Sequence, residues 1–230
     1  MNNQNNFYKH QLTPSLLNNQ VFDLVKDAIL GNKYSPNQRL NEVELSSSFG
    51  VSRGPIREAL QKLSYEGLVR LVPNKGAFVI SFSPKEIEDI FEIREYLELL
   101  AVNLAAQRAD QSDCRKLSDL LKATEQIIEK NRSASYPWDS DFHIKIAQCT
   151  HNQELFEYIN RLNVQTHLIR YRSGSSPGRA AGAFKEHVEI YEALCEKNCE
   201  KSERLMMHHI RAAKNNIMNL IFDEKNRFPK

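Results

Sequence analysis

Imidazole and carboxylate side chains recur on the apolar faces of predicted helices in the C-terminal two thirds of this 230-residue chain. One segment carries an aspartate and a histidine four residues apart, on the face that also bears Ile146. Two later segments each place one histidine among apolar residues at helical spacing. These residues are Asp139, His143, His187 and His209. Three imidazoles and a carboxylate suit a divalent transition metal ion, with Zn²⁺ preferred and Ni²⁺ or Mn²⁺ as alternatives.

Each of these histidines, taken alone, has a second interpretation. A single inward histidine is usually a hydrogen-bonded core residue and not a ligand. Because three separate helices each aim a donor group inward, we favour the metal site. His208 lies off the apolar face of its helix, and His10, His151 and His167 show no partner pattern.

Two arginines at the start of a short helix offer a second kind of chemistry. Arg53 and Arg57 lie four residues apart around Gly54 and Pro55, directly after Ser52 as the expected helix cap. Their guanidinium groups would point the same way, and a guanidinium matches guanine O6 and N7 or a phosphate. The Ser52 hydroxyl could reach a phosphate, and Gly54 would let the backbone come close. Two arginines on a helix are often only a solvated face, so the surrounding elements must decide.

Those elements predict a winged helix-turn-helix. Capping residues and apolar spacing indicate helices over 15–31, 42–49 and 53–67. Two short β-prone runs follow, 68–73 and 77–82, joined by a turn whose glycine can adopt positive φ. Such a fold places the N-terminal residues of its third helix against base edges in the DNA major groove. We therefore expect the two arginines to contact DNA.

The remainder of the chain predicts an antiparallel helical bundle. Six helical stretches joined by short polar loops cover 83–109, 113–131, 138–149, 153–172, 183–197 and 199–222. The expected fold class is mainly α: a winged helix-turn-helix with a small β-hairpin wing, followed by the all-α bundle. The expected domains are 1–80, with a core at about 15–80, and 83–230.

Composition restricts the functional class. The chain is 41% hydrophobic and 26% charged with a net charge of +2, and residues 1–80 carry nine Lys and Arg against six Asp and Glu. No stretch approaches the roughly 20 consecutive apolar residues of a membrane helix, and the N-terminus lacks an export signal. We therefore expect a cytoplasmic protein without membrane contact, whose four cysteines are reduced thiols.

The N-terminal segment resembles a known family. The stretch "LNEVELSSSFGVSRGPIREALQKLSYEGLVRLVPNKGAFV", with its "SR" and "REAL" elements, is similar to the DNA-binding domain of GntR-type bacterial transcription regulators. The resemblance covers about residues 15–80. It implies that Arg53 and Arg57 contact operator bases or phosphates and that the wing tip at Lys75 and Gly76 reaches the minor groove. A basic residue that some members use in the second helix corresponds here to Val43, so that contact is expected to be missing.

The C-terminal segment resembles the FCD domain of FadR-type GntR regulators. The matching elements are "RxxxE" at Arg94, "DSDFH", "EHVEIYEAL" and "MMHHI". Metal-binding members of this branch match at all four of the metal-ligand candidates named above. The resemblance implies a dimer, and a bundle that binds a small metabolite, commonly an organic acid. A dimer would place two recognition helices on a roughly palindromic operator in double-stranded DNA.

Arginines are the candidates for holding such an acid. We expect an effector carboxylate to complete the coordination of the metal and to pair with Arg94, which lies on an apolar helix face. An ion pair with Glu98 explains Arg94 equally well. Arg170 and Arg172 are further candidates, although a solvated helix end would also account for them.

Two other functional classes stay open at this point. A helical metalloenzyme could use the same ligands to activate water, but the nearest acids, Asp141 and Glu186, are expected on other helix faces. An architectural DNA-binding protein would have an unliganded bundle. We expect a ligand-responsive regulator and not an enzyme. The sequence does not say which effector it binds, or whether the effector releases or promotes DNA binding.

Overall fold

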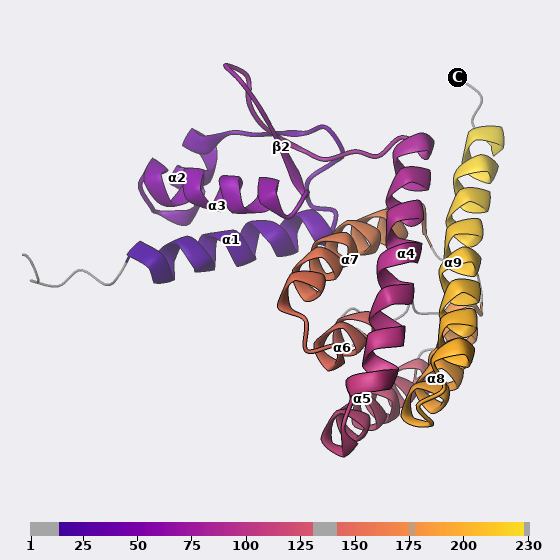
Figure 1. The fold of residues 1–230 in the computed structure, drawn as a ribbon. Helices are drawn as coiled ribbons and strands as arrows, with labels where there is room; N and C mark the ends of the chain where they lie inside the picture. Colours follow the sequence, from indigo (N-terminus) through magenta and orange to yellow (C-terminus); the bar gives the residue numbers. More distant parts are fainter. Residues whose placement is uncertain (1–13, 131–141, 175, 177, 228–230) are drawn as a thin grey trace, which may run out of the picture. The chain divides into compact units, whose positions relative to one another are not determined.

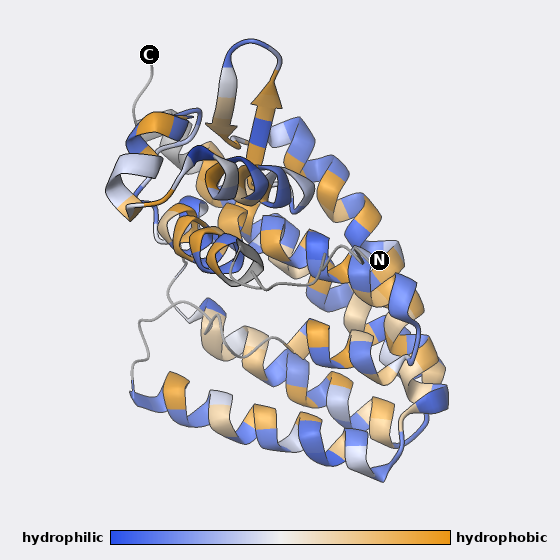
Figure 2. Cartoon of the chain, turned by 90° about the vertical axis from the view of Figure 1, so that its left-hand side faces the viewer, coloured by the Kyte–Doolittle hydropathy of each residue, from blue (hydrophilic) through white to orange (hydrophobic). Residues whose placement is uncertain are grey.

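The structure is a computed structural model that describes residues 14–130, 142–174, 176 and 178–227 (Figure 1). Contacts divide the chain into two compact units, Met1–Ser81 and Phe82–Lys230, and each unit has its own buried apolar residues. Hydrophobic and hydrophilic residues are interleaved along the helices, as expected for amphipathic helices that bury one face (Figure 2).

Within its described residues, the first unit consists of three helices and a small sheet. Its elements are α1 (Pro14–Leu30), β1 (Arg39–Leu40), α2 (Glu42–Phe49), α3 (Arg53–Tyr65), β2 (Val69–Val72) and β3 (Gly76–Val79). The α2 helix begins where the Asn41 side chain accepts the N–H of Val43, and it ends at Gly50 in the left-handed conformation (φ 65°). The α1 helix packs on α3, and both bury aliphatic side chains such as Ile29 and Ile56. The predicted helix-turn-helix is confirmed.

The sheet has one strand more than the predicted hairpin. Its order is β1-β3-β2, all antiparallel, and β1 pairs Arg39 with Phe78 and the buried Leu40 with Ala77. A strand of two residues is too short to show an alternating pattern, so periodicity could not predict it. β1 ties the segment before α2 to the wing.

The second unit is a bundle built, within its described residues, from six helices. They are α4 (Pro84–Arg108), α5 (Gln111–Lys130), α6 (Phe142–Cys149), α7 (Gln153–Ser173), α8 (Arg179–Cys195) and α9 (Cys199–Arg227). The α4 helix starts with a capping box between Ser83 and Glu86. It runs antiparallel to α9 and also packs on α6 and α7, while α8 packs on α9 and α5 (Figure 1). Buried alanines of α4, including Ala101 and Ala105, let the neighbouring helices approach closely.

Two cysteines depart from the expected reduced state. Cys114 near the start of α5 and Cys195 at the end of α8 form a disulfide, with their Cα atoms 6.1 Å apart. They are 81 residues apart in sequence, so only the pairing of α5 with α8 reveals that they meet. Cys149 is buried and Cys199 is half-buried, and both are free thiols. Among the described helices, none is long and apolar enough to cross a membrane.

Candidate functional site

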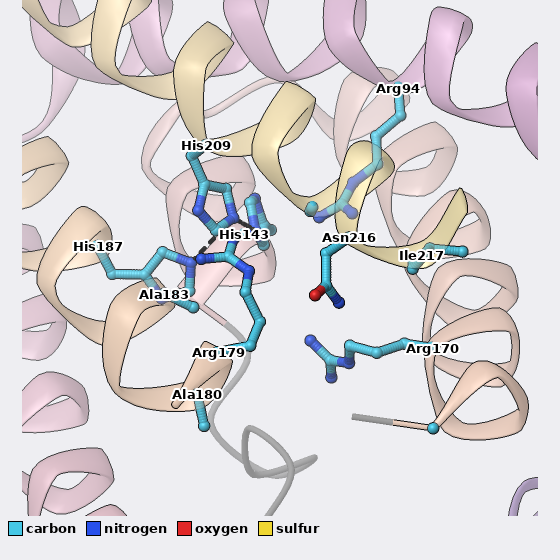
Figure 3. A pocket seen from close by; sticks show the side chains of 12 residues that line it. Arg94, His143, Arg170, Arg179, Ala180, Ala183, His187, His209, Asn216 and Ile217 are labelled. Atoms are coloured by element: carbon cyan, nitrogen blue, oxygen red, sulfur yellow. Dashed lines mark hydrogen bonds between the residues drawn. The ribbon is translucent and has the colours of Figure 1, made fainter. Parts of the chain in front are cut away.

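Three histidines from three helices of the bundle meet at one point. His143 comes from α6, His187 from α8 and His209 from α9, and all three are buried. The Nε2 atom of His209 lies 3.2 Å from Nε2 of His143 and 3.2 Å from Nε2 of His187 (Figure 3). The three histidines therefore converge as the apolar faces predicted, and His208, the neighbour that was set aside, is exposed.

Carboxylates lie behind two of the imidazoles. Glu186 Oε2 accepts a hydrogen bond of 2.6 Å from His209 Nδ1, and Glu98 Oε1 lies 3.0 Å from His143 Nδ1. Metal-binding histidines commonly place their second ring nitrogen against a carboxylate, which fixes the ring orientation and the tautomer. The expectation that Glu186 points away from the histidines was wrong. Its position one residue before His187 suggested another face, but its side chain reaches across to α9.

The charge state of the cluster also fits metal binding. Burial raises the pKa of Glu186, but hydrogen bonds from His209 and Arg179 outweigh this and lower it to about 2. Burial lowers the pKa of His209 to about 4, against the opposing effect of Glu186, and burial also places the pKa of His187 well below its ordinary value. Both imidazoles are therefore neutral at neutral pH, which is the form that binds metal ions.

The positions of the protons on the three rings favour a bound cation over hydrogen bonds between the histidines. Because ionised Glu186 only accepts, His209 Nδ1 must carry the proton and His209 Nε2 must carry a lone pair. That lone pair can accept one N–H, yet two other Nε2 atoms face it. Two nitrogen ligands on a tetrahedral Zn²⁺ would be separated by roughly 3.3 Å, close to the observed 3.2 Å. The three histidines can therefore bind a metal ion. Asp139, the fourth predicted ligand, lies outside the described residues.

A cavity of about 60 Å³ opens beside the histidines. Its walls combine the three imidazoles with the side chains of Arg94, Arg170, Arg179 and Asn216, and with apolar residues of α8 and α9 (Figure 3). Of the arginines predicted to face an effector, Arg94 and Arg170 line this cavity and Arg172 does not. Arg179 was missed by sequence reasoning. The sequence predicted that this helix begins at residue 183, whereas α8 begins at Arg179, so Arg179 was not expected on a helix face.

The cavity arginines are held by partners within the bundle. Arg94 Nε lies 3.2 Å from Glu98 Oε1 in a buried ion pair, which is the alternative that the sequence offered for Arg94. Arg179 contacts both oxygens of Glu186, at 2.8 and 3.0 Å. Arg170 Nη2 lies 2.7 Å from His167 Nδ1. Three guanidinium groups therefore face one small cavity, and two of them are paired with carboxylates.

The predicted DNA-contacting residues lie on the surface of the first unit. Ser52, Arg53, Gly54 and Arg57 are exposed at the start of α3, and Lys75 and Gly76 are exposed at the wing tip. Ser52 makes no side-chain capping hydrogen bond, and a side chain at Gly54 would meet only the Ser52 hydroxyl, at 4.0 Å. Arg57 Nε lies 2.7 Å from Glu42 Oε2 in an exposed ion pair, which has little effect on stability.

Two further arginines extend this basic surface. Arg39 on β1 and Arg70 on β2 both lie opposite Phe78 on β3, so they project from the same face of the sheet. Both are exposed, and the Arg39 guanidinium lies close to Gly76 at the wing tip. Sequence reasoning missed Arg39 because it did not predict β1.

Comparison with protein families places both units. Residues 17–79 match the bacterial regulatory proteins of the gntR family, and residues 89–212 match the FCD domain. The chain belongs to the GntR family of regulators and carries an FCD domain. It is 31% identical over 192 residues to the HTH-type transcriptional regulator YdhC of Bacillus subtilis, covering 83% of this chain and 86% of that protein. It is 26% identical over 212 residues to the transcriptional repressor RspR of Escherichia coli K12, and the match covers 91% of this chain and 93% of that protein.

Solved structures agree on the fold of this GntR-family chain. Escherichia coli McbR/YncC superposes with a TM-score of 0.74 at 23% identity, over 90% of this chain and 98% of that one. A GntR regulator from Rhodococcus sp. RHA1 superposes with a TM-score of 0.72 at 22% identity, over 88% of this chain and 97% of that one. The chain is thus a DNA-binding transcriptional regulator, and its relatives are regulators and not enzymes.

Proposed function

We propose that this regulator controls its affinity for operator DNA through a small organic acid that binds beside a divalent metal ion in the bundle. The observation that carries the proposal is the convergence of three Nε2 atoms on the wall of an arginine-lined cavity. The metal ion, the organic acid, the operator DNA and the dimer each involve a different set of residues.

The metal ion is held by His143, His187 and His209, with Asp139 as the fourth ligand. Zn²⁺ fits best because it accepts nitrogen and oxygen ligands in tetrahedral geometry, and Ni²⁺ and Mn²⁺ are the alternatives. A bound cation would attract a carboxylate to the open side of the cluster. Glu186 and Glu98 orient His209 and His143 from behind and are not ligands in this proposal.

The organic acid is held by guanidinium groups that line the same cavity. Arg170 comes from the C-terminal end of α7, Arg179 from the N-terminal end of α8, and Arg94 from α4 (Figure 3). Arg94 both balances the buried Glu98 and faces the ligand. Arg172 does not line the cavity, and we therefore drop it from the effector site. The size of the cavity and its charge favour a compact acid with more than one oxygen acceptor.

The operator is read by the start of α3 and by the wing. Arg53 and Arg57 enter the major groove, where Ser52 and the exposed backbone at Gly54 approach a phosphate. Lys75 and Gly76 lie over the minor groove. We add Arg39 and Arg70 as phosphate contacts, because they share a face of the sheet next to the wing tip.

A homodimer binds the two halves of a roughly palindromic operator. The bundle presents large exposed apolar side chains along α4, at Ile93, Tyr96 and Leu100, and their spacing puts them on one helix face. An apolar stripe of this kind suits burial against the same stripe of a second copy. The acid then favours one arrangement of the two DNA-binding units, and operator binding changes the affinity for the acid by the same factor.

Bound-metal analysis combined with calorimetry tests the proposal. Protein purified without added metal salts should contain about one transition metal ion per chain. A panel of small organic acids should include one that binds the metal-loaded protein and fails to bind after chelation. If no metal co-purifies or reconstitutes, or if acid affinity is the same before and after chelation, the proposed function is wrong.

A further inference from the structure

The Cys114–Cys195 disulfide connects two helices that also pack through apolar side chains. The α5 and α8 helices run antiparallel, so the start of α5 meets the end of α8 at the disulfide. At the opposite end of the pair, Ile128 of α5 packs against Ala180 and Ala183 of α8. The two helices are thus joined by the disulfide near Cys114 and Cys195 and by aliphatic packing at the opposite end.

The α8 helix carries much of the ligand site on the same stretch of backbone. Arg179, Glu186 and His187 reach the cavity or the histidine cluster from α8, and Ala180 and Ala183 also line the cavity. From Ala180 to Cys195 the helix spans about 22 Å, at roughly 1.5 Å per residue. A restraint at Cys195 therefore limits how α8 can shift relative to the histidines on α6 and α9.

Solvent can reach the cysteine pair. Cys114 and Cys195 are both half-buried and line an open groove on the surface of the bundle. Arg115 and Lys197 line the same groove, and Asp110 is the acidic residue among its lining, so cationic groups outnumber the carboxylate there. Cationic side chains near a thiol favour the thiolate, which is the reactive form. By contrast, Cys149 is buried, and burial raises the pKa of its thiol to about 11, which keeps it protonated and unreactive.

We propose that Cys114 and Cys195 form a reversible thiol–disulfide site for hydroperoxides, which sets how tightly the histidine cluster holds its metal ion. One thiolate attacks the peroxide oxygen and displaces hydroxide or alkoxide, giving a sulfenic acid. The second thiolate attacks that sulfur and releases hydroxide, which is protonated to water, so the two thiols lose two electrons as the S–S bond forms and those electrons reduce the O–O bond. A dithiol reductant reverses the change by thiol–disulfide exchange.

The oxidised form should bind the metal more tightly. The disulfide holds α8 in the position seen here, so less conformational freedom is lost when the three imidazoles gather around an ion. We expect affinity to be higher by roughly fivefold in the oxidised form, within the usual range of coupling between two sites. Closing a loop of 81 residues should also raise Tm, by on the order of 10 °C.

The experiment compares the full chain after peroxide treatment and after reduction with a phosphine that is then removed. Peptide mapping reports the cysteine pairing, thermal melting reports the restraint, and competition with a chromophoric chelator reports Zn²⁺ affinity. Wild type and the control Cys199→Ser, which alters a half-buried thiol outside the pair, should switch in all three measurements. Cys114→Ser and Cys195→Ser should each stay in the reduced, weaker-binding state.

Two results would overturn the inference. Peptide mapping could show Cys114 and Cys195 still as thiols after peroxide treatment, or the disulfide could form with no change in Tm or in Zn²⁺ affinity. The coupling to the metal rests on the metal site proposed above. If Zn²⁺ binds neither the oxidised nor the reduced protein, the proposed metal site is wrong and the coupling to it is wrong as well. Peptide mapping and thermal melting then still decide whether the redox site exists.

Discussion

Glu186 Oε2 on α8 accepts a 2.6 Å hydrogen bond from Nδ1 of His209 on α9. Arg179 holds both oxygens of the same carboxylate from its other side. This arrangement fixes the His209 ring so that Nε2 faces the other two histidines. The guanidinium of Arg179 also faces the cavity, so one carboxylate connects the wall of the proposed effector site to the proposed metal site.

Replacing Glu186 with Gln should weaken metal binding by about 10- to 100-fold, because the ring of His209 loses its orienting carboxylate. Chelator competition with Zn²⁺ measures the change. Glu189→Gln provides a matched control, since Glu189 is exposed on the same helix. Equal losses in the two variants would mean that Glu186 acts only through the overall charge of α8.

Each histidine of the cluster should be indispensable for the metal. His143→Ala, His187→Ala and His209→Ala should each reduce the bound metal to background in protein that remains helical by circular dichroism. His208→Ala, which alters the exposed neighbour on α9, should keep the full metal content. A variant of the cluster that retained stoichiometric metal would remove that histidine from the ligand set.

Substitutions of Arg94 and Arg170 should have different effects on the stability of the protein and on its affinity for the organic acid. Arg94→Ala leaves the buried Glu98 without its cationic partner and should lower the free energy of unfolding by about 3 kcal/mol, measured by urea denaturation. Arg170→Ala should cost much less stability and should weaken binding of the organic acid by at least roughly tenfold in calorimetry. The proposed role of the cavity is contradicted if Arg170→Ala binds the acid as wild type does.

Arginines of the first unit should differ in what they contribute to DNA binding. Arg53→Ala and Arg57→Ala should each weaken operator binding by roughly 1–3 kcal/mol if they reach base edges, and should also reduce discrimination against altered half-sites. Arg39→Ala should weaken binding to specific and scrambled duplexes alike, with a shallower salt dependence. Fluorescence anisotropy at two salt concentrations distinguishes these patterns, and the exposed Arg115→Ala of the bundle serves as the control.

Acidification should destabilise the metal-free protein. The pKa of His209 is about 4 in the fold and 6.5 for an ordinary solvated histidine, so the unfolded chain binds the extra proton first as the pH falls. His187 shifts in the same direction. The contribution of His209, ~3 kcal/mol, is complete above pH 6.5 and is lost as the pH falls toward 4. Urea melts across this window should show the loss, and His209→Gln should show a smaller one.

The sequence predicted those features that depend on local periodicity. Apolar spacing located the helices that carry His143, His187 and His209, and capping residues such as Asn41 and Gly50 located the helix-turn-helix. Apolar spacing and capping residues act within one or two helical turns, so they can be recognised without knowing how the helices pack.

Features that depend on which helices become neighbours could not be predicted. The Glu186–His209 contact, the cavity position of Arg179 and the Cys114–Cys195 disulfide all join residues brought together by the packing of α8 on α9 and α5. A long side chain such as Glu186 also reaches beyond the face that its Cα position indicates. The short strand β1 escaped detection because two residues carry no periodicity.

Control of DNA binding through the metal site can be measured by an anisotropy titration of the operator duplex with metal-loaded wild type and with His187→Ala, each with and without the organic acid that binds the protein. The acid should change the operator affinity of wild type by roughly fivefold or more and leave that of the variant unchanged. An equal response in both proteins, or a response in neither, would contradict control of DNA binding through the metal site.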